Sequence, residues 1–403
     1  MEQFKTLYLY ELKKITGKKL FRITFSLFLL ITAALTILQL TGKSYVDGKV
    51  ADTHYHMFLV DREYERALSG RAIDQTLLDE TMTAYRTIPN PADRYTLTEE
   101  YQTNARPYSA IFQLISRWTD TPSLEDVLCL DVSENTFYEA RLALLKKEWQ
   151  KYFLTEAEQD FWMEKEKKVS IPYTYYYHEG YSILCKTFNA FAVLIPLFIS
   201  VCLSGVFAEE HVRRTDQLLL SSVNGKNTVY LAKMLAGVTV SVCSCALMVL
   251  TAALFSLGIF GTDGFGMQVQ VTLYPFSYPM SIGESCLILS GVALFLSVLM
   301  SVFVMFLSET LRGSVAALSV CTGCIILASM VSMPPQFRVL SQIWDWLPFS
   351  FLERVHVFDL RTLPLFGHCF VSWQIVPILY LICSAGIVAL GGRIYRKYQV
   401  SGR

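Results

Sequence analysis

Apolar residues gather in one segment near the N-terminus and in five segments of the second half, with a long polar stretch between them. A bilayer core about 30 Å thick needs roughly 20 apolar helical residues to cross it. The pattern therefore predicts an all-α polytopic membrane protein with six transmembrane helices. These predicted spans are 23–40, 183–208, 230–260, 282–307, 313–333 and 371–390.

The first span is short, and a cleaved signal peptide is the alternative because such a peptide also follows a basic region. The preceding region is long and patterned, and no small-x-small cleavage site follows Leu40. An uncleaved span is therefore favoured.

Residues 1–22 predict a cytoplasmic amphipathic helix that lies in the inner membrane interface. Lysines lie off its apolar stripe. The alternative is a basic leader that only sets orientation. The stripe at helical spacing comprises Phe4, Leu7, Tyr8, Leu12 and Ile15.

Basic residues in the short connections set the orientation, since positive charge is retained on the cytoplasmic side. The short loops on one side carry only Arg338, Arg354 and Arg361. The other side carries Lys5, Lys13, Lys14, Lys18, Lys19, Arg22, Arg213, Arg214, Lys226, Arg312, Arg393, Arg396, Lys397 and Arg403. We expect a multi-pass protein of the plasma membrane with both termini cytoplasmic.

The polar stretch 41–180 is then a large extracytoplasmic domain, and the membrane domain continues over 181–403. Helical spacing of apolar residues predicts helices over 51–69, 73–86, 108–118 and 134–168, with a capping box at Thr155 and Glu158. A stripe predicted to form its core comprises Phe137, Leu144, Leu145, Trp149 and Phe153.

The ten cysteines do not predict a metal or redox site. Most lie in apolar spans, where they act as small packing residues. Cys321 and Cys324 have C-x-x-C spacing but no nearby histidine or carboxylate completes a site. Cys129 and Cys369 lie on the outer side, and whether they pair is left open.

The segment 209–229, between the second and third spans, combines charge, a leucine cluster and an Asn-Gly turn. It is too polar to span and too apolar for a free linker. We expect a short cytoplasmic helix that covers the membrane and a docked partner, ended by Asn224-Gly225.

In these residues the chain resembles the permease subunits of ATP-binding-cassette exporters, specifically the type-2 permease family. The shared order is an acidic residue at 209 or 210, Thr215, a double leucine, a serine, a turn, and Lys233 in the third span. The chain departs from the family in having Arg214 where glycine is usual and no proline in the turn.

The resemblance implies export by two permeases, identical or paralogous, each receiving one ABC ATPase subunit. No phosphate-binding loop is present, since Asn227 follows Gly225-Lys226. The permease is then no enzyme and binds no cofactor, because the partner ATPase holds the ATP. The predicted ATPase-coupling residues are Glu209, Glu210, Arg213, Arg214, Leu218, Leu219, Leu220 and Lys226.

The last outer loop alternates aromatic and polar residues, which predicts short helices at the outer interface. In the resembled family such elements border the substrate exit, so this loop is a candidate outer gate. An aromatic anchor is the alternative. The residues concerned are Trp344, Trp346, Phe349 and Phe351.

Two other classes remain as alternatives. Glu209-Glu210-x-x-x-Arg214 matches the E-E-x-x-x-R signature of intramembrane proteases, but the histidine motifs that this chemistry needs are missing. An ion-coupled secondary transporter needs ionisable residues near the bilayer midplane. Lys233 and Glu309 instead lie near span ends, where we expect long side chains to reach the interface. The balance of 35 basic and 35 acidic residues does not suggest nucleic acid as a partner.

Overall fold

The structure is a computed structural model that describes residues 2–46, 48–89, 94–213, 227–272, 276–365 and 367–397. It is mostly helical and divides into two compact units. The membrane unit comprises Met1–Ala34, Cys185–Leu254 and Leu287–Arg403. The inserted unit comprises Leu35–Leu184 and Phe255–Cys286, so it draws on the connection between the third and fourth predicted spans as well.

Within the described residues, five helices are long and apolar enough to cross a membrane. The fifth predicted span, 313–333, coincides with α15 (Ser314–Met330), whose 17 residues extend about 26 Å at 1.5 Å per residue and fall short of a typical bilayer core. The five long helices are α2 (Lys19–Ile37), α9 (Glu179–Leu203), α12 (Thr228–Phe260), α14 (Ile282–Leu311) and α18 (Ser372–Lys397).

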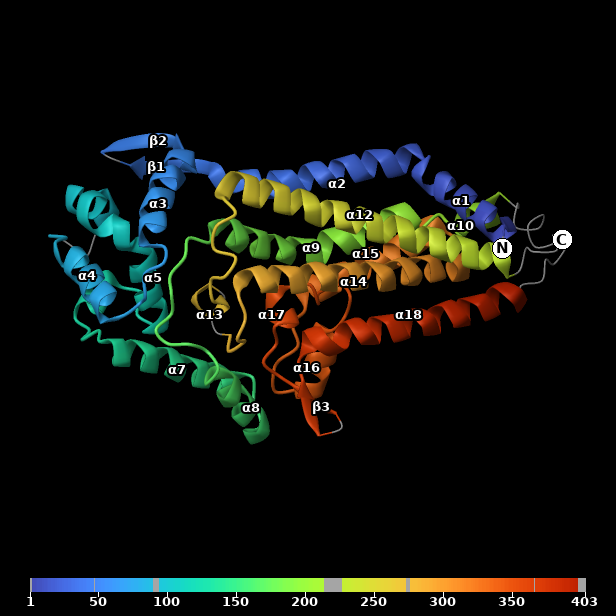
Figure 1. The fold of residues 1–403 in the computed structure, drawn as a ribbon. Helices are drawn as coiled ribbons and strands as arrows, with labels where there is room; N and C mark the ends of the chain where they lie inside the picture. The colour runs from blue at the N-terminus through green and yellow to red at the C-terminus, as the bar shows by residue number, and fades with distance from the viewer. Residues whose placement is uncertain are drawn as a thin grey trace. The chain divides into compact units, whose positions relative to one another are not determined.

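Short elements complete the membrane unit. The N-terminal helix α1 (Glu2–Thr16) precedes α2, and α10 (Ala208–Val212) follows α9. Between α15 and α18 lie α16 (Arg338–Asp345), α17 (Arg354–Val357) and the antiparallel pair β3 (Leu363–Leu365) and β4 (His368–Phe370). The long helices run roughly parallel in Figure 1, and α1 lies at the same end of this unit as the last turn of α18.

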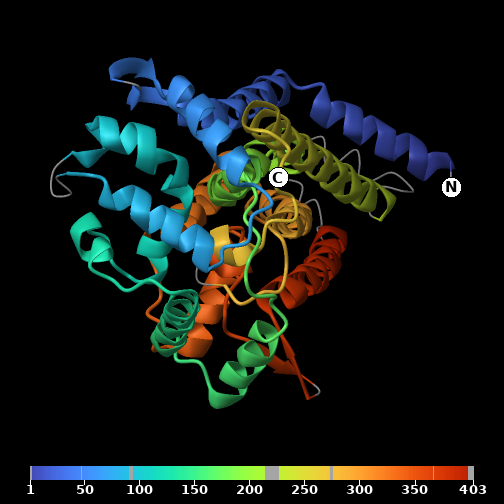
Figure 2. The same ribbon diagram turned by 60° about the vertical axis from the view of Figure 1, so that its left-hand side comes forward.

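The α2 helix lies alongside α12 in both views (Figures 1 and 2). At one end of this pair the hydroxyls of Thr36 and Ser256 are 3.5 Å apart. Nearer the N-terminus, the Tyr8 hydroxyl of α1 donates a hydrogen bond to Thr239 of α12 at 3.1 Å. The predicted stripe of α1 therefore packs in part against protein.

The inserted unit contains a hairpin and six helices, followed by a short helix from its second segment. The hairpin is β1 (Thr41–Val46) paired antiparallel with β2 (Lys49–Thr53), with an irregular register between Thr41 and Ser44. The helices are α3 (His54–Leu68), α4 (Gln75–Arg86), α5 (Ser109–Trp118), α6 (Leu124–Leu128), α7 (Glu134–Lys151) and α8 (Glu156–Glu166), with α13 (Val269–Thr272) in the second segment. Short 3-10 and π turns over Tyr95–Leu97, Tyr101–Ala105 and Arg106–Tyr108 connect α4 to α5.

The core of this unit confirms most of the predicted stripe. Phe137, Leu145 and Trp149 are buried, and Phe137 stacks on Trp118 with ring centroids 4.5 Å apart. The prediction is wrong for Phe153, whose side chain is 52% exposed. This residue lies after the end of α7 and has a φ of 51°. The predicted capping box at Thr155 is confirmed at the start of α8.

The prediction of a helix over 51–69 is wrong at its N-terminal end. Residues up to Thr53 belong to the hairpin, and the helix begins at His54. Gly48 has a φ of 76°, a conformation that glycine adopts without strain and that a tight hairpin turn requires.

The chain returns from this unit along α3. The Ile73 amide donates to the Tyr173 carbonyl at 2.7 Å, and the Tyr175 hydroxyl donates to Glu65 at 2.8 Å. The pKa of Glu65 is raised to about 8, mainly because the carboxyl group is buried and also because acidic residues lie nearby. The hydrogen bond from Tyr175 lowers the pKa but does not outweigh burial.

Candidate coupling site

The end of α9 turns into α10 around one serine of α14. The Ser308 hydroxyl accepts hydrogen bonds from the amides of Phe207 at 3.2 Å and Ala208 at 3.0 Å. It donates to the Ser204 carbonyl at 2.6 Å. A single buried hydroxyl thus satisfies backbone groups that the break between the two helices would leave unpaired. This turn positions Glu209 and Glu210.

Glu210 is buried between two lysines from distant parts of the chain. Lys14 of α1 approaches one carboxylate oxygen at 2.5 Å, and Lys233 of α12 forms a close ion pair with the other. Lys233 has no exposed surface and Glu210 is 7% exposed. The expectation that Lys233 reaches the membrane interface is therefore wrong, because its ammonium group is held inside the protein by Glu210.

Two further pairs flank this one. Lys18 contacts Glu209 at 2.6 Å, and His211 lies 3.0 Å from Glu309 of α14. Glu309 is also buried, so it too does not extend to the interface as expected. These side chains bring α1, α10, α12 and α14 together. The charge cluster comprises Lys14, Lys18, Glu209, Glu210, His211, Lys233 and Glu309.

Lys14 remains charged in this setting. Burial alone would lower its pKa, but the hydrogen bond and the negative charge of Glu210 outweigh that effect and raise it. Glu11 lies 3.7 Å from the same ammonium group and is itself buried. Removing one partner from a buried ion pair costs about 3–5 kcal/mol, whereas replacing both with apolar groups is often neutral. The cluster therefore ties α1 firmly to α10.

The structure places only part of the predicted coupling set. Glu209 and Glu210 lie in α10, and Arg213 follows it with an exposed side chain. The rest lie outside the described residues: Arg214, Leu218, Leu219, Leu220 and Lys226. The α10 part of the charge cluster, Glu209 to His211, thus lies shortly before these residues in sequence.

The predicted outer-gate residues all pack within the membrane unit. Trp344 donates its indole N–H to the Val331 carbonyl at 2.9 Å, and Trp346 donates to the Ser372 hydroxyl at 3.1 Å. Phe349 and Phe351 are buried. These contacts attach the loop to the residues that end α15 and begin α18. The role of the loop as an outer gate stays a prediction.

A buried arginine holds the same loop. The Arg361 guanidinium contacts Asp359 at 2.6 Å and Asp345 at 2.5 Å, and it donates to Ser341 at 2.6 Å. Both Arg361 and Asp359 are less than 5% exposed. As a result α16 turns its polar residues inward, while Val339, Leu340 and Ile343 are exposed.

The long apolar helices define a multi-pass membrane protein. Residues 57–393 match the family described as ABC-2 family transporter protein. This match covers well over half of the chain, so the chain belongs to the ABC-2 transporter family and is a permease of an ABC transporter. A comparison with curated proteins gives no match.

The site geometry does not favour the protease alternative. Glu209 and Glu210 both engage lysines, and Glu210 has a cation on each carboxylate oxygen. A carboxylate that activates water must accept a proton, and two neighbouring ammonium groups oppose protonation.

Proposed function

We propose that the chain is the membrane-spanning subunit of an ATP-driven exporter and receives mechanical work from a separate ABC ATPase through residues 209–226. The observation that carries this proposal is the charge cluster, in which the first residues of that segment join α10 to α1, α12 and α14. A push on the segment would reach the two long helices α12 and α14, and α1 with them, through ion pairs.

Rigid transmission requires an element that cannot yield locally. Lys233 and Glu210 cannot separate without leaving a buried charge unpaired, which is costly in a low-dielectric interior. Ser308 fixes the turn before them. Movement of α10 would therefore carry the first turns of α12 and the last turns of α14 with it.

The proposal includes six spans, with α15 as the fifth. Its helix is short, but an extended segment follows Met330, and tilting or local thinning of the bilayer accommodates such a mismatch. Both termini are then cytoplasmic, the inserted unit is extracytoplasmic, and the cluster lies at the inner surface of the plasma membrane. Exposed Leu9 and Tyr10 give α1 an apolar surface for the lipid interface.

A second permease, identical or paralogous, completes the assembly. The long helices α2, α12, α14 and α18 carry exposed apolar side chains, and both lipid and a second copy would cover such surfaces. No substrate class is proposed for the exporter, and the ATP is bound by the ATPase.

Purification of the tagged chain from its own cells in mild detergent tests this function. The expected eluate contains an ABC ATPase and hydrolyses ATP. Leu219→Asp should remove the ATPase while the permease elutes at its usual size, because a carboxylate opposes docking of an apolar contact. Leu250→Asn, at a 63% exposed position of α12, is the control and should keep the ATPase. Wild-type eluate without any ABC ATPase would contradict the proposal.

A further inference from the structure

A cavity of about 680 Å³ lies within the inserted unit, between the β1–β2 hairpin, α3 and the turns that precede α5. Its size falls within the range of about 300–1,000 Å³ that small-molecule sites occupy. Neither the coupling site nor the export function accounts for it. Its apolar lining consists of Tyr45, Val50, Met57, Leu97 and Tyr101.

Part of this lining is exposed although it is apolar. Val50 is 67% exposed and Leu97 is 42% exposed. Apolar side chains gathered around a concavity mark binding sites more often than isolated ones do. Deeper in the unit, burial raises the pKa of Tyr101 to about 12, so its ring contributes a neutral surface. The cavity therefore suits an apolar body.

Arg106 adds a buried positive charge to the lining. It is 3% exposed and donates to Asp61 at 2.8 Å, to the Gln102 side chain at 2.6 Å and to the Met57 carbonyl at 3.4 Å. A guanidinium group has five N–H donors, more than these three acceptors use. Arg106 thus has donor capacity for an additional acceptor.

Lys43 adds a second positive charge in the same lining. Its side chain is exposed, and within the described part of the chain it forms no ion pair. Asp61 is the one acidic residue among those that line the cavity, and it already contacts Arg106. The lining therefore carries one net positive charge, which favours an anion.

We propose that this cavity binds a small amphipathic carboxylate, with its apolar body between Val50, Leu97 and Tyr101 and its acid group held by Lys43 and Arg106. A medium-chain fatty acid and the carboxyl end of a short apolar peptide share this chemistry. The site is a binding site on the inserted unit and goes beyond the export function.

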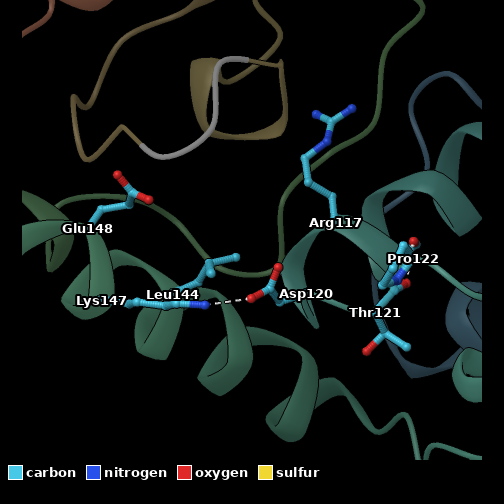
Figure 3. Close-up of a pocket in the computed structure, with 8 residues that line it drawn as sticks. Arg117, Asp120, Thr121, Pro122, Leu144, Lys147 and Glu148 are labelled. Atoms are coloured by element: carbon cyan, nitrogen blue, oxygen red, sulfur yellow. Dashed lines mark hydrogen bonds and ion pairs between the residues drawn. The ribbon is translucent and has the colours of Figure 1, made fainter. Parts of the chain in front are cut away.

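A second hollow in the same unit provides a contrast (Figure 3). It measures about 360 Å³ and is lined by Arg117, Glu148 and a pair formed by Lys147 and Asp120, 2.7 Å apart. Figure 3 shows Lys147 and Asp120 pointing toward each other, so the lysine is already neutralised there. Lys147→Gln is consequently a matched control for the loss of an exposed lysine.

The test uses the full chain in lipid nanodiscs, with radiolabelled decanoate and radiolabelled acetyl-Leu-Phe as probes and empty nanodiscs as background. At least one probe should bind saturably with one site per chain. Binding of decanoate alone points to a lipid-derived acid, and binding of the peptide alone points to a peptide terminus. Acetyl-Leu-Phe-amide should bind at least several-fold more weakly than the acid if the peptide binds.

Two variants at exposed positions test the location. Val50→Trp should abolish binding because the indole fills the cavity, and Lys43→Gln should weaken it about twofold to fivefold, the usual effect of losing an exposed ion pair. Lys147→Gln should bind like the wild type. Absence of saturable binding, or equal binding by Val50→Trp and the wild type, would overturn the proposal. The assay contains no ATPase, so its failure leaves the export function standing.

Discussion

Replacing the buried pair of Lys233 and Glu210, singly and together, tests whether the charge cluster is a rigid connection. The variants are Lys233→Met, Glu210→Leu and the double variant. Each single change leaves one charged side chain buried beside an apolar partner. The double change replaces both with side chains of similar size.

The expected loss of stability differs between the two single variants. Glu210→Leu leaves Lys233, which has no exposed surface, without its close partner and should cost about 3–5 kcal/mol. Lys233→Met should cost less, since Lys14 remains 2.5 Å from Glu210. In the double variant Lys14 keeps Glu11 at 3.7 Å and some access to water. The double variant should therefore be close to the wild type in stability.

Thermal unfolding of the full chain in nanodiscs measures these differences, and a double-mutant cycle isolates the pair. We expect a coupling energy of at least about 3–5 kcal/mol, because a double variant close to the wild type leaves the losses of both single variants in the cycle, and we expect the double variant to be more stable than Glu210→Leu. Losses that add in the double variant would refute the reasoning, because independent side chains give additive effects. A stable double variant that no longer supports transport would separate the transmission role of the pair from its contribution to stability.

Three further predictions concern other parts of the chain. Glu65 has a pKa of about 8 in the folded protein, against an ordinary value of 4.5, so its protonation stabilises the fold fully at low pH and this stabilisation is lost as the pH rises through about 8. Thermal unfolding should therefore show a smaller loss of stability between pH 6 and 9 in Glu65→Gln than in the wild type. Equal losses in the two proteins would contradict the assignment. Arg361→Ala should lower the free energy of unfolding by about 3–5 kcal/mol. Arg361→Lys should recover only part of that lost free energy, because an ammonium group cannot match the forked contacts of the guanidinium with Asp345 and Asp359. Full recovery with lysine, measured by the same thermal unfolding, would count against this account. A membrane-impermeant maleimide should label exposed Cys129 on intact cells, and Cys129→Ala should lower the signal to what the less exposed Cys369 contributes, whereas labelling only after permeabilisation would reverse the orientation.

The long helices could be predicted from the sequence because span length and apolar content are local properties. The predicted spans all coincide with helices, with boundaries that shift by a few residues. The β1–β2 hairpin was not predicted, although the dipeptide Asp47-Gly48, between Val46 and Lys49, is a hairpin signal. The helical spacing that continues into α3 outweighed that signal at the boundary.

The charge cluster could be predicted only in part. Glu209 and Glu210 stand out because two carboxylates end an apolar span, but their partners Lys14 and Lys233 are distant in sequence. The position of Lys233 near the start of a span predicts an interfacial side chain. Only the tertiary contact with Glu210 shows that it is buried. Glu11 is not part of the predicted apolar stripe of α1, yet it is buried, as Ile15 is.

Photo-crosslinking from the coupling segment tests the central claim most directly. Benzoyl-phenylalanine replaces Leu219 in one variant and Leu250, on the exposed side of α12, in another. On irradiation of membranes, position 219 should form a covalent adduct with an ABC ATPase subunit, identified by mass spectrometry, and position 250 should form none. Absence of that adduct at 219, or equal adducts at both positions, would contradict a permease driven by a separate ATPase through this segment.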